Sequence, residues 1–143
     1  MSFDIEAIRK FAVDWYVALD RHVPLRDVLP MLVDEGLEMR FPETTAYGHT
    51  GFTEWYDAVT HRFFDERHEV TKVDATVKDD EAMVTVLVNW QAKVWDPPAA
   101  TSTWLGFDAD QTWVVVPGED GSGLRIRTYI VNALTPMPGS AEL

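Results

Sequence analysis

Residues 82–95, AMVTVLVNWQAKVW, decide the fold class of this chain. From Ala82 to Val94 every second residue is alanine, valine or tryptophan. Most of the residues between them are polar. A period of two residues is typical of a β-strand with one buried face. We therefore predict a long strand over 82–95, with Trp90 on the face of the valines and Trp95 on the opposite face.

Three more segments with the same period surround this strand. They cover residues 68–78, 103–116 and 124–134, and the links between them are short and rich in Asp, Pro and Gly. Short links between consecutive strands imply antiparallel pairing. The second part of the chain is thus predicted to be a four-stranded antiparallel meander.

The first part of the chain has helical spacing. An apolar face formed by Ile5, Ile8, Ala12, Trp15 and Leu19 predicts a helix that ends near Arg21. We expect a short helix from Pro24, a strand over 37–41 closed by Pro42, a polar loop over 43–48, and a third helix capped by Thr50. Helices followed by a strongly bent antiparallel sheet define the α+β class.

The composition limits the number of domains and the kinds of partner that the chain can have. The 143 residues include 24 acidic and 12 basic side chains, which gives a net charge of −12. The chain contains no cysteine. This size predicts one domain over 1–135, followed by a flexible tail over 136–143. The acidic balance disfavours nucleic-acid and anionic-membrane partners, and an acidic N-terminus with no long apolar run predicts a cytoplasmic protein.

These elements resemble a known superfamily. The residues Trp15-Tyr16-Val17-Ala18-Leu19-Asp20, the strand ending at Pro42, and the run Gly48-x-x-Gly51-Phe52-x-x-Trp55 before the meander resemble the nuclear transport factor 2-like proteins. That superfamily includes ketosteroid isomerases, scytalone dehydratases, limonene epoxide hydrolases and SnoaL-like polyketide cyclases. The resemblance implies a cystatin-like cone with three N-terminal helices in a curved sheet, a homodimer, and chemistry without a cofactor.

The resemblance to ketosteroid isomerases places three residues. Tyr16 is similar to the tyrosine of the first helix that donates to the enolate oxygen, and Asp110 falls near the aspartic acid that supports the same oxygen. Phe41 occupies the position of the catalytic base. A phenyl ring cannot take a proton, so steroid isomerisation by that route is not expected.

The resemblance to scytalone dehydratases places two more residues. His68 is similar to one of their two catalytic histidines, and Asp20 is similar to the aspartate of their first helix. Histidine titrates near neutral pH and can act as acid or base. Residues 103–112 contain no match for the second histidine. We name His68, Tyr16, Asp20 and Asp110 as candidate catalytic residues, against the alternative that Tyr16 fills the core and Asp110 is solvated.

The sequence alone does not fix the orientation of His68 and Tyr16. His68 shares a strand face with Val70, whereas Val73, Ala75 and Val77 share the other face. Both sets can face the core only if a β-bulge separates them. Trp15 and Tyr16 lie about 100° apart on a helix, so we expect one in the core and one toward the mouth of the cone.

Aromatic residues supply a candidate ligand pocket. The chain has six tryptophans, and large aromatic area on both sheet faces suits an apolar ligand on one side and a second subunit on the other. The candidate ligand-binding residues are Trp15, Phe41, Trp55, Trp90, Trp104, Trp113 and Asn132. The alternative is that these side chains only fill the core. The four histidines lack the spacing of a metal site, so no metal is expected.

The resulting prediction is a protein that holds a small apolar or aromatic molecule in its cone. Its sharper form is a cofactor-free dehydratase, isomerase or cyclase. The two alternatives are a binding module without catalysis and a dimeric adaptor domain without a ligand. A cavity well below the roughly 300–1,000 Å³ of usual ligand sites would favour the adaptor.

Overall fold

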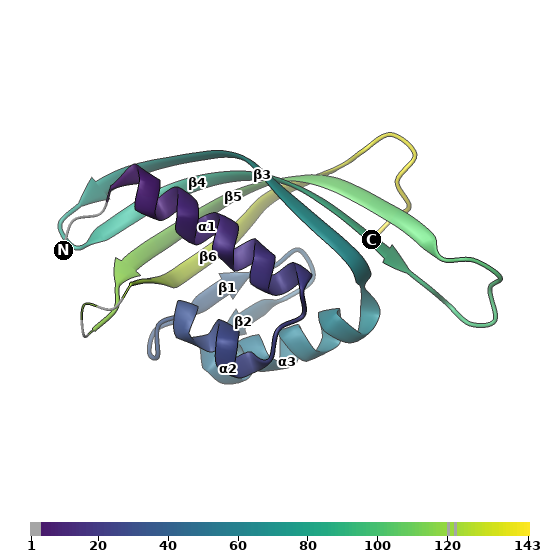
Figure 1. The fold of residues 1–143 in the computed structure, drawn as a ribbon, viewed down its shortest axis with the longest axis horizontal. Coiled ribbons are helices and arrows are strands. Elements are labelled where there is room, and N and C mark those ends of the chain that lie inside the picture. Colours follow the sequence, from purple (N-terminus) through teal and green to yellow (C-terminus); the bar gives the residue numbers. More distant parts are fainter. Residues whose placement is uncertain (1–3, 120, 122) are drawn as a thin grey trace.

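A computed structural model describes residues 4–119, 121 and 123–143 of the chain. Four helical segments and six strands form one α+β unit (Figure 1). The helical segments are α1 (Ile5–Asp20), α2 (Leu25–Val28), the 3₁₀ turn η1 (Leu29–Met31) and α3 (Gly48–Arg62). The described residues contain no helix that is both long enough and apolar enough to cross a membrane.

The strands form a single sheet in the order β2-β1-β6-β5-β4-β3. Their bounds are β1 (Glu38–Arg40), β2 (Thr45–Tyr47), β3 (Phe64–Lys78), β4 (Glu81–Val94), β5 (Thr103–Pro117) and β6 (Leu124–Pro136). The predicted antiparallel meander over the last four strands is confirmed. The sheet is not wholly antiparallel, because β1 pairs with β6 in parallel.

Two local predictions in the first part of the chain are wrong. The expected polar loop over 43–48 contains β2, whose Ala46 is buried against the core and whose backbone pairs with β1. The third helix begins at Gly48 and not after Thr50. Gly48 has a φ of +67°, so the chain turns sharply from β2 into α3 at a residue that tolerates this conformation.

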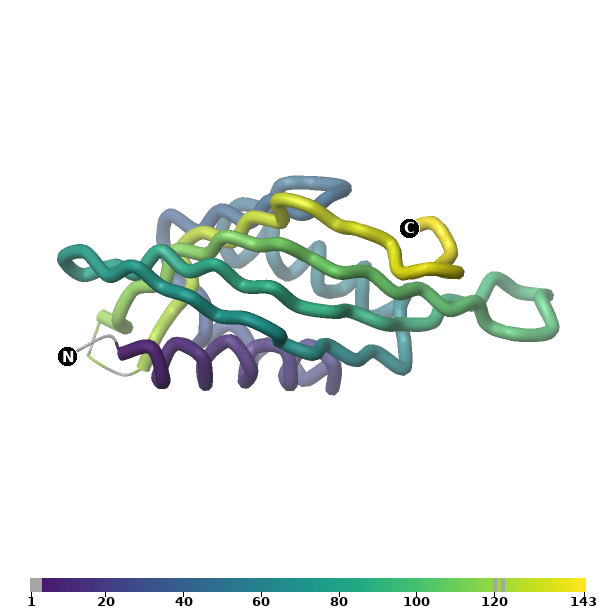
Figure 2. Tube along the Cα trace, turned by 90° about the horizontal axis from the view of Figure 1, so that it is seen from above, coloured from purple at the N-terminus to yellow at the C-terminus, as the bar shows by residue number. Residues whose placement is uncertain are grey.

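The sheet curves around α1 and leaves room at one end. In Figure 1 the strands β3 to β6 bend across the molecule, with α1 against β3 and α2 and α3 below the sheet. Viewed from above, the four long strands run beside one another and α1 runs alongside β3 (Figure 2). The core at the centre includes the fully buried Trp15, Phe52 and Trp113.

Strand β3 has a bulge between His68 and Val73, which the sequence leaves as one of two possibilities. Its pairing with β4 shifts between Val70 and Lys72, so both His68 and Val73 face inward. A second shift lies between Phe64 and Arg67. Glu66 lies within this shift and lines the cavity on the face of His68, two residues further along the strand.

Candidate functional site

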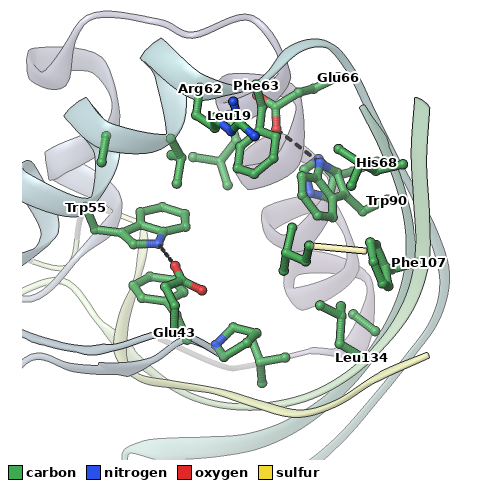
Figure 3. A pocket seen from close by; sticks show the side chains of 18 of the residues that line it. Leu19, Glu43, Trp55, Arg62, Phe63, Glu66, His68, Trp90, Phe107 and Leu134 are labelled. Carbon is green, nitrogen blue, oxygen red and sulfur yellow. Dashed lines mark hydrogen bonds between the residues drawn. The ribbon is translucent and has the colours of Figure 1, made fainter. Parts of the chain in front are cut away.

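A cavity of about 770 Å³ opens between α3 and the concave face of the sheet (Figure 3). Aliphatic and aromatic side chains form most of its wall, among them Leu19, Trp55, Phe63, Trp90, Phe107 and Leu134. The polar groups in the wall include Glu43, Glu66, His68 and Gln111. A mostly apolar cavity with a few placed polar groups has the character of a small-molecule site.

An Asp–His pair lies in the wall of this cavity. Asp20 is the last residue of α1, and His68 lies near the start of β3. Asp20 Oδ1 is 2.5 Å from His68 Nδ1, and Asp20 Oδ2 accepts the backbone N–H of His68 at 2.8 Å. An ionised carboxylate can only accept hydrogen bonds. The pair therefore places the proton of a neutral imidazole on Nδ1 and leaves Nε2 with a free lone pair.

The faces of the imidazole are covered. The ring of His68 stacks on Tyr16 with centroids 4.4 Å apart, and Trp90 lies nearly parallel to it at 6.1 Å. The side chain of His68 is 12% exposed. Among the described residues Nε2 has no hydrogen-bond partner, so the ring edge that carries Nε2 is the part that a cavity ligand can reach.

Gln111 is the buried polar residue on the floor of the site. Its Oε1 accepts from the Tyr16 hydroxyl at 2.6 Å and from Trp113 Nε1 at 2.9 Å. An indole N–H can only donate, so the contact with Trp113 identifies the oxygen of the amide. Both donors occupy Oε1, and the NH₂ group of Gln111 remains available to a cavity ligand.

The two tyrosines next to Gln111 are held in the neutral form. The hydroxyls of Tyr16 and Tyr129 lie 3.0 Å apart. Burial raises the pKa of Tyr16 well above its ordinary value of 10.0, and burial also raises the pKa of Tyr129. Because Tyr16 donates to Gln111, Tyr129 donates to Tyr16. Their protons therefore fix the orientation of the amide and are not free for a ligand.

The opposite wall of the cavity is an aromatic stack. Phe41 and Trp55 are parallel with ring centroids 3.8 Å apart, and Trp55 Nε1 donates to Glu43 Oε1 at 2.9 Å. Besides His68, the ionisable side chains in the cavity wall are Arg62, Glu43, Glu66 and Glu142. Arg62 also pairs with Asp96 at 2.7 Å. The excess of carboxylates makes the cavity unfavourable for an anionic ligand.

The structure brings several predicted site residues together. His68, Phe41, Trp55 and Trp90 line the cavity, and Asp20 lies directly behind His68. Tyr16, Trp15 and Trp113 lie in the core next to the site and do not line the cavity. The expectation that Trp15 or Tyr16 points toward the mouth is wrong, because the sheet curves around α1 and buries both positions.

Three predicted residues lie on the outer face of the sheet, away from the cavity. Asp110 and Trp104 have even positions in β5, whereas the residues of β5 that line the cavity have odd positions. Trp104 Nε1 donates to Gln91 Oε1, and the exposed Asn132 donates to Thr112 Oγ1. Their placement follows from strand parity, which separates two faces without saying which one is concave.

Gln111 and Glu66 are not among the site residues predicted from the sequence. Gln111 has the parity of Trp113, but that signal has a meaning only once the inner face is known. The sequence predicts that the strand begins at His68, whereas β3 begins at Phe64 and therefore includes Glu66. Glu66 shares the parity of His68, whose face the sequence leaves open.

The last residues of the described chain also contribute. Met137 N donates to Gly106 O at 2.9 Å and Gly106 N donates to Ser140 Oγ at 3.0 Å, which holds residues 137–140 beside β5. Glu142 and Leu143 then line the cavity. In the part of the chain that the structure describes, no group of three His, Asp or Glu side chains is placed to hold a metal ion.

Comparisons with solved structures identify the fold. A protein assigned as an aromatic ring hydroxylase from Novosphingobium aromaticivorans has a TM-score of 0.78 at 18% identity, over 95% of this chain and 96% of that one. One assigned as a scytalone dehydratase from the same organism gives 0.76 at 15% identity, over 96% and 94%. A hexachlorocyclohexane dehydrochlorinase gives 0.75 at 15%, over 96% and 91%.

Other matched structures name the fold and show its range. They include a protein assigned as a dehydratase of the NTF2-like family from Streptomyces avermitilis (TM-score 0.73, 17% identity), a Nostoc punctiforme protein of unknown function with a cystatin-like fold (0.70, 14%) and the CaMKII hub of S. rosetta (0.68, 14%). The chain has this NTF2-like, cystatin-like fold, as its sequence predicts. No protein-family model matches the chain. No curated protein matches it either.

Proposed function

We propose that this protein is a cofactor-free acid–base enzyme that eliminates water from a small, neutral, aromatic β-hydroxy carbonyl compound. The observation that carries the proposal is the Asp20–His68 pair in the wall of a largely apolar cavity. Two of the matched structures support this reaction class, since their names are those of a dehydratase and a dehydrochlorinase, which both catalyse eliminations. The cavity volume lies within the range of ordinary ligand sites, which disfavours the adaptor alternative.

His68 is the base of the proposed reaction. Its Nε2 takes the proton from the carbon next to the carbonyl group, and the negative charge of Asp20 stabilises the imidazolium that forms. The NH₂ group of Gln111 donates to the carbonyl oxygen, where negative charge develops. Tyr16 is a positioning residue in this scheme, because it acts through the amide oxygen of Gln111.

The charge and the shape of the cavity indicate the substrate class. The carboxylates of Glu43 and Glu142 disfavour carboxylate and phosphate ligands. The parallel rings of Phe41 and Trp55 and the indole of Trp90 offer apolar surface to an aromatic ring. We therefore expect a neutral compound with an aromatic group and one carbonyl group.

The test uses two probes that do not require the natural substrate. The first is 4-phenylbutan-2-one in D₂O, in which mass spectrometry measures deuterium exchange of the protons next to the carbonyl. The second is 4-hydroxy-4-phenylbutan-2-one, whose loss of water gives benzalacetone and an ultraviolet absorbance. We expect both reactions with the wild type, and a loss of about 100-fold or more in His68→Gln.

A matched control separates this histidine from the others. His61 is exposed on α3 and lies outside the cavity, so His61→Gln should retain both activities. Exchange and elimination that are equal in wild type and His68→Gln would overturn the proposal. Saturable binding of the ketones without either reaction would favour the alternative of a binding module without catalysis.

We also propose a cytoplasmic homodimer that forms through the outer face of the sheet. The similarity to an oligomeric hub protein supports an assembling surface on this fold. Met83 lies on this face of β4 with 58% exposure, so Met83→Asp should weaken the dimer. Sedimentation equilibrium of both proteins tests it, and a wild type that remains monomeric at high concentration would contradict it.

A further inference from the structure

A second carboxylate–imidazole pair lies at the same crossing of α1 and β3. His22 Nε2 is 2.5 Å from Glu66 Oε2. Each of these residues is two positions away from a member of the Asp20–His68 pair, and the order of acid and imidazole is reversed. The end of α1 and the start of β3 are therefore joined by two such pairs, and the proposed reaction uses only one of them.

Glu66 faces the cavity, whereas His22 faces outward. The side chain of Glu66 is 9% exposed and lines the cavity wall, where its Oε1 accepts from Trp90 Nε1 at 3.0 Å (Figure 3). The side chain of His22 is 27% exposed and lines a separate groove of about 410 Å³ together with Pro24 and Thr53. The pair thus connects the cavity with an outer groove.

The backbone at both ends of this connection is unusual. Among the described residues only three that are not glycine have a positive φ: His22 at +49°, Asp65 at +50° and Asp79 at +57°. The first is a member of the pair, and the second precedes Glu66 within the bulge of β3. Such conformations cost energy and cluster at functional sites. At His22 this conformation also ends α1, because the backbone nitrogens of His22 and Val23 donate to Leu19 O and Ala18 O.

We propose that Glu66 is the proton donor to the leaving group and that His22 resupplies its proton from solvent. This inference rests on the proposed elimination. As His68 Nε2 removes the proton, the C–H electron pair forms the carbon–carbon double bond and the C–O pair leaves with the hydroxyl oxygen. The Glu66 carboxyl gives its proton to that oxygen, and water departs. His22 Nε2 then returns a proton to Glu66, while Nδ1 takes one from solvent and His68 releases its own.

The experiment compares two leaving groups. Hydroxide must be protonated as it leaves, whereas acetate leaves without a proton, so 4-hydroxy- and 4-acetoxy-4-phenylbutan-2-one differ in their need for an acid. Glu66→Gln retains the size of the side chain and the acceptor for Trp90 but cannot give up a proton. We expect kcat for the hydroxy compound to fall about 100-fold or more and kcat for the acetoxy compound to fall less than threefold. His22→Asn is chosen because asparagine tolerates the positive φ. It should also lower kcat selectively for the hydroxy compound, but by a smaller factor than Glu66→Gln.

Glu43→Gln is the matched control. Glu43 also lines the cavity and also accepts from an indole N–H, but it has no histidine partner among the described residues. This variant should affect the two substrates equally. If Glu66→Gln also affects them equally, or affects neither, Glu66 is not the donor and the inference fails. Deuterium exchange of 4-phenylbutan-2-one needs only the base, so its retention in Glu66→Gln and loss in His68→Gln would preserve the proposed function in that case.

Discussion

The carboxylate of Asp20 holds His68 from two sides: Oδ1 lies 2.5 Å from the ring nitrogen Nδ1, and Oδ2 lies 2.8 Å from the backbone nitrogen. The two residues are 48 positions apart in the chain. The backbone contact fixes the carboxylate, and the fixed carboxylate orients the ring. Position and tautomer of the proposed base therefore depend on one side chain of α1.

Replacing Asp20 with Asn should reverse the tautomer of His68. The amide oxygen can retain the bond from the backbone N–H, and the amide nitrogen then donates to Nδ1. The imidazole proton moves to Nε2, which can no longer accept a proton from a substrate. We expect the elimination rate to fall by about 10²–10⁴-fold with little change in KM.

Nitrogen-15 NMR of the histidine ring measures this tautomer directly. The wild type should carry its proton on Nδ1, and Asp20→Asn should carry it on Nε2. Thermal unfolding serves as the control, because the variant retains both hydrogen bonds. Full activity in a variant with the reversed tautomer would show that Nε2 is not the base.

Tyr16→Phe tests the orientation of Gln111. The variant removes one of the two donors to Oε1 and leaves Trp113 as the other. We expect a loss of about 1 kcal/mol in the free energy of unfolding and a rise in KM of about three- to tenfold as the amide loses its fixed position. Tyr47, which is 67% exposed, gives the control variant Tyr47→Phe, which should change neither quantity. An unchanged KM in Tyr16→Phe would speak against a carbonyl contact by Gln111.

Stability should fall at alkaline pH. Burial raises the pKa of Tyr16 and Tyr129 in the folded protein, whereas the unfolded chain loses these protons near pH 10. Above that pH the folded state binds more protons, so the free energy of unfolding decreases by about 1.4 kcal/mol per pH unit for each tyrosine, up to the pKa of the folded state. Below the unfolded pKa the contribution is fully present.

Urea unfolding between pH 8 and pH 11 measures this slope. The slope should be smaller in Tyr129→Phe, which retains only one of the two tyrosines. A wild-type free energy that stays constant from pH 9 to pH 11 would contradict the burial of the two hydroxyls.

Tryptophan fluorescence should report occupancy of the cavity. Trp55 and Trp90 line it, whereas Trp95 is 50% exposed and lies outside. We expect 4-phenylbutan-2-one to quench the wild type saturably. Trp55→Phe and Trp90→Phe should each lose part of the quenching. Trp95→Phe should retain the quenching, because it leaves both tryptophans of the cavity wall in place. Equal quenching losses in all three variants would indicate collisional quenching without a site.

The sequence by itself determined most of the elements and the antiparallel pairing of the four long strands. Alternation along 82–95 and the helical spacing from Ile5 to Leu19 are local signals, because each reports burial of one face of one element. The change of parity between Val70 and Val73 indicated that a bulge is needed if both residues face the core, and the structure has that bulge. The choice of Asp20 and His68 as candidates came from a family resemblance, and the structure shows that the two residues meet.

The tertiary structure decided which side chains meet. Parity divides β5 into two faces, but the curvature of the whole sheet makes the face of Gln111 concave and leaves Trp104 and Asp110 outside. The crossing of α1 and β3 pairs Glu66 with His22, and these residues are 44 positions apart in the chain. Such contacts depend on how distant segments pack, and no local pattern of side chains records that packing.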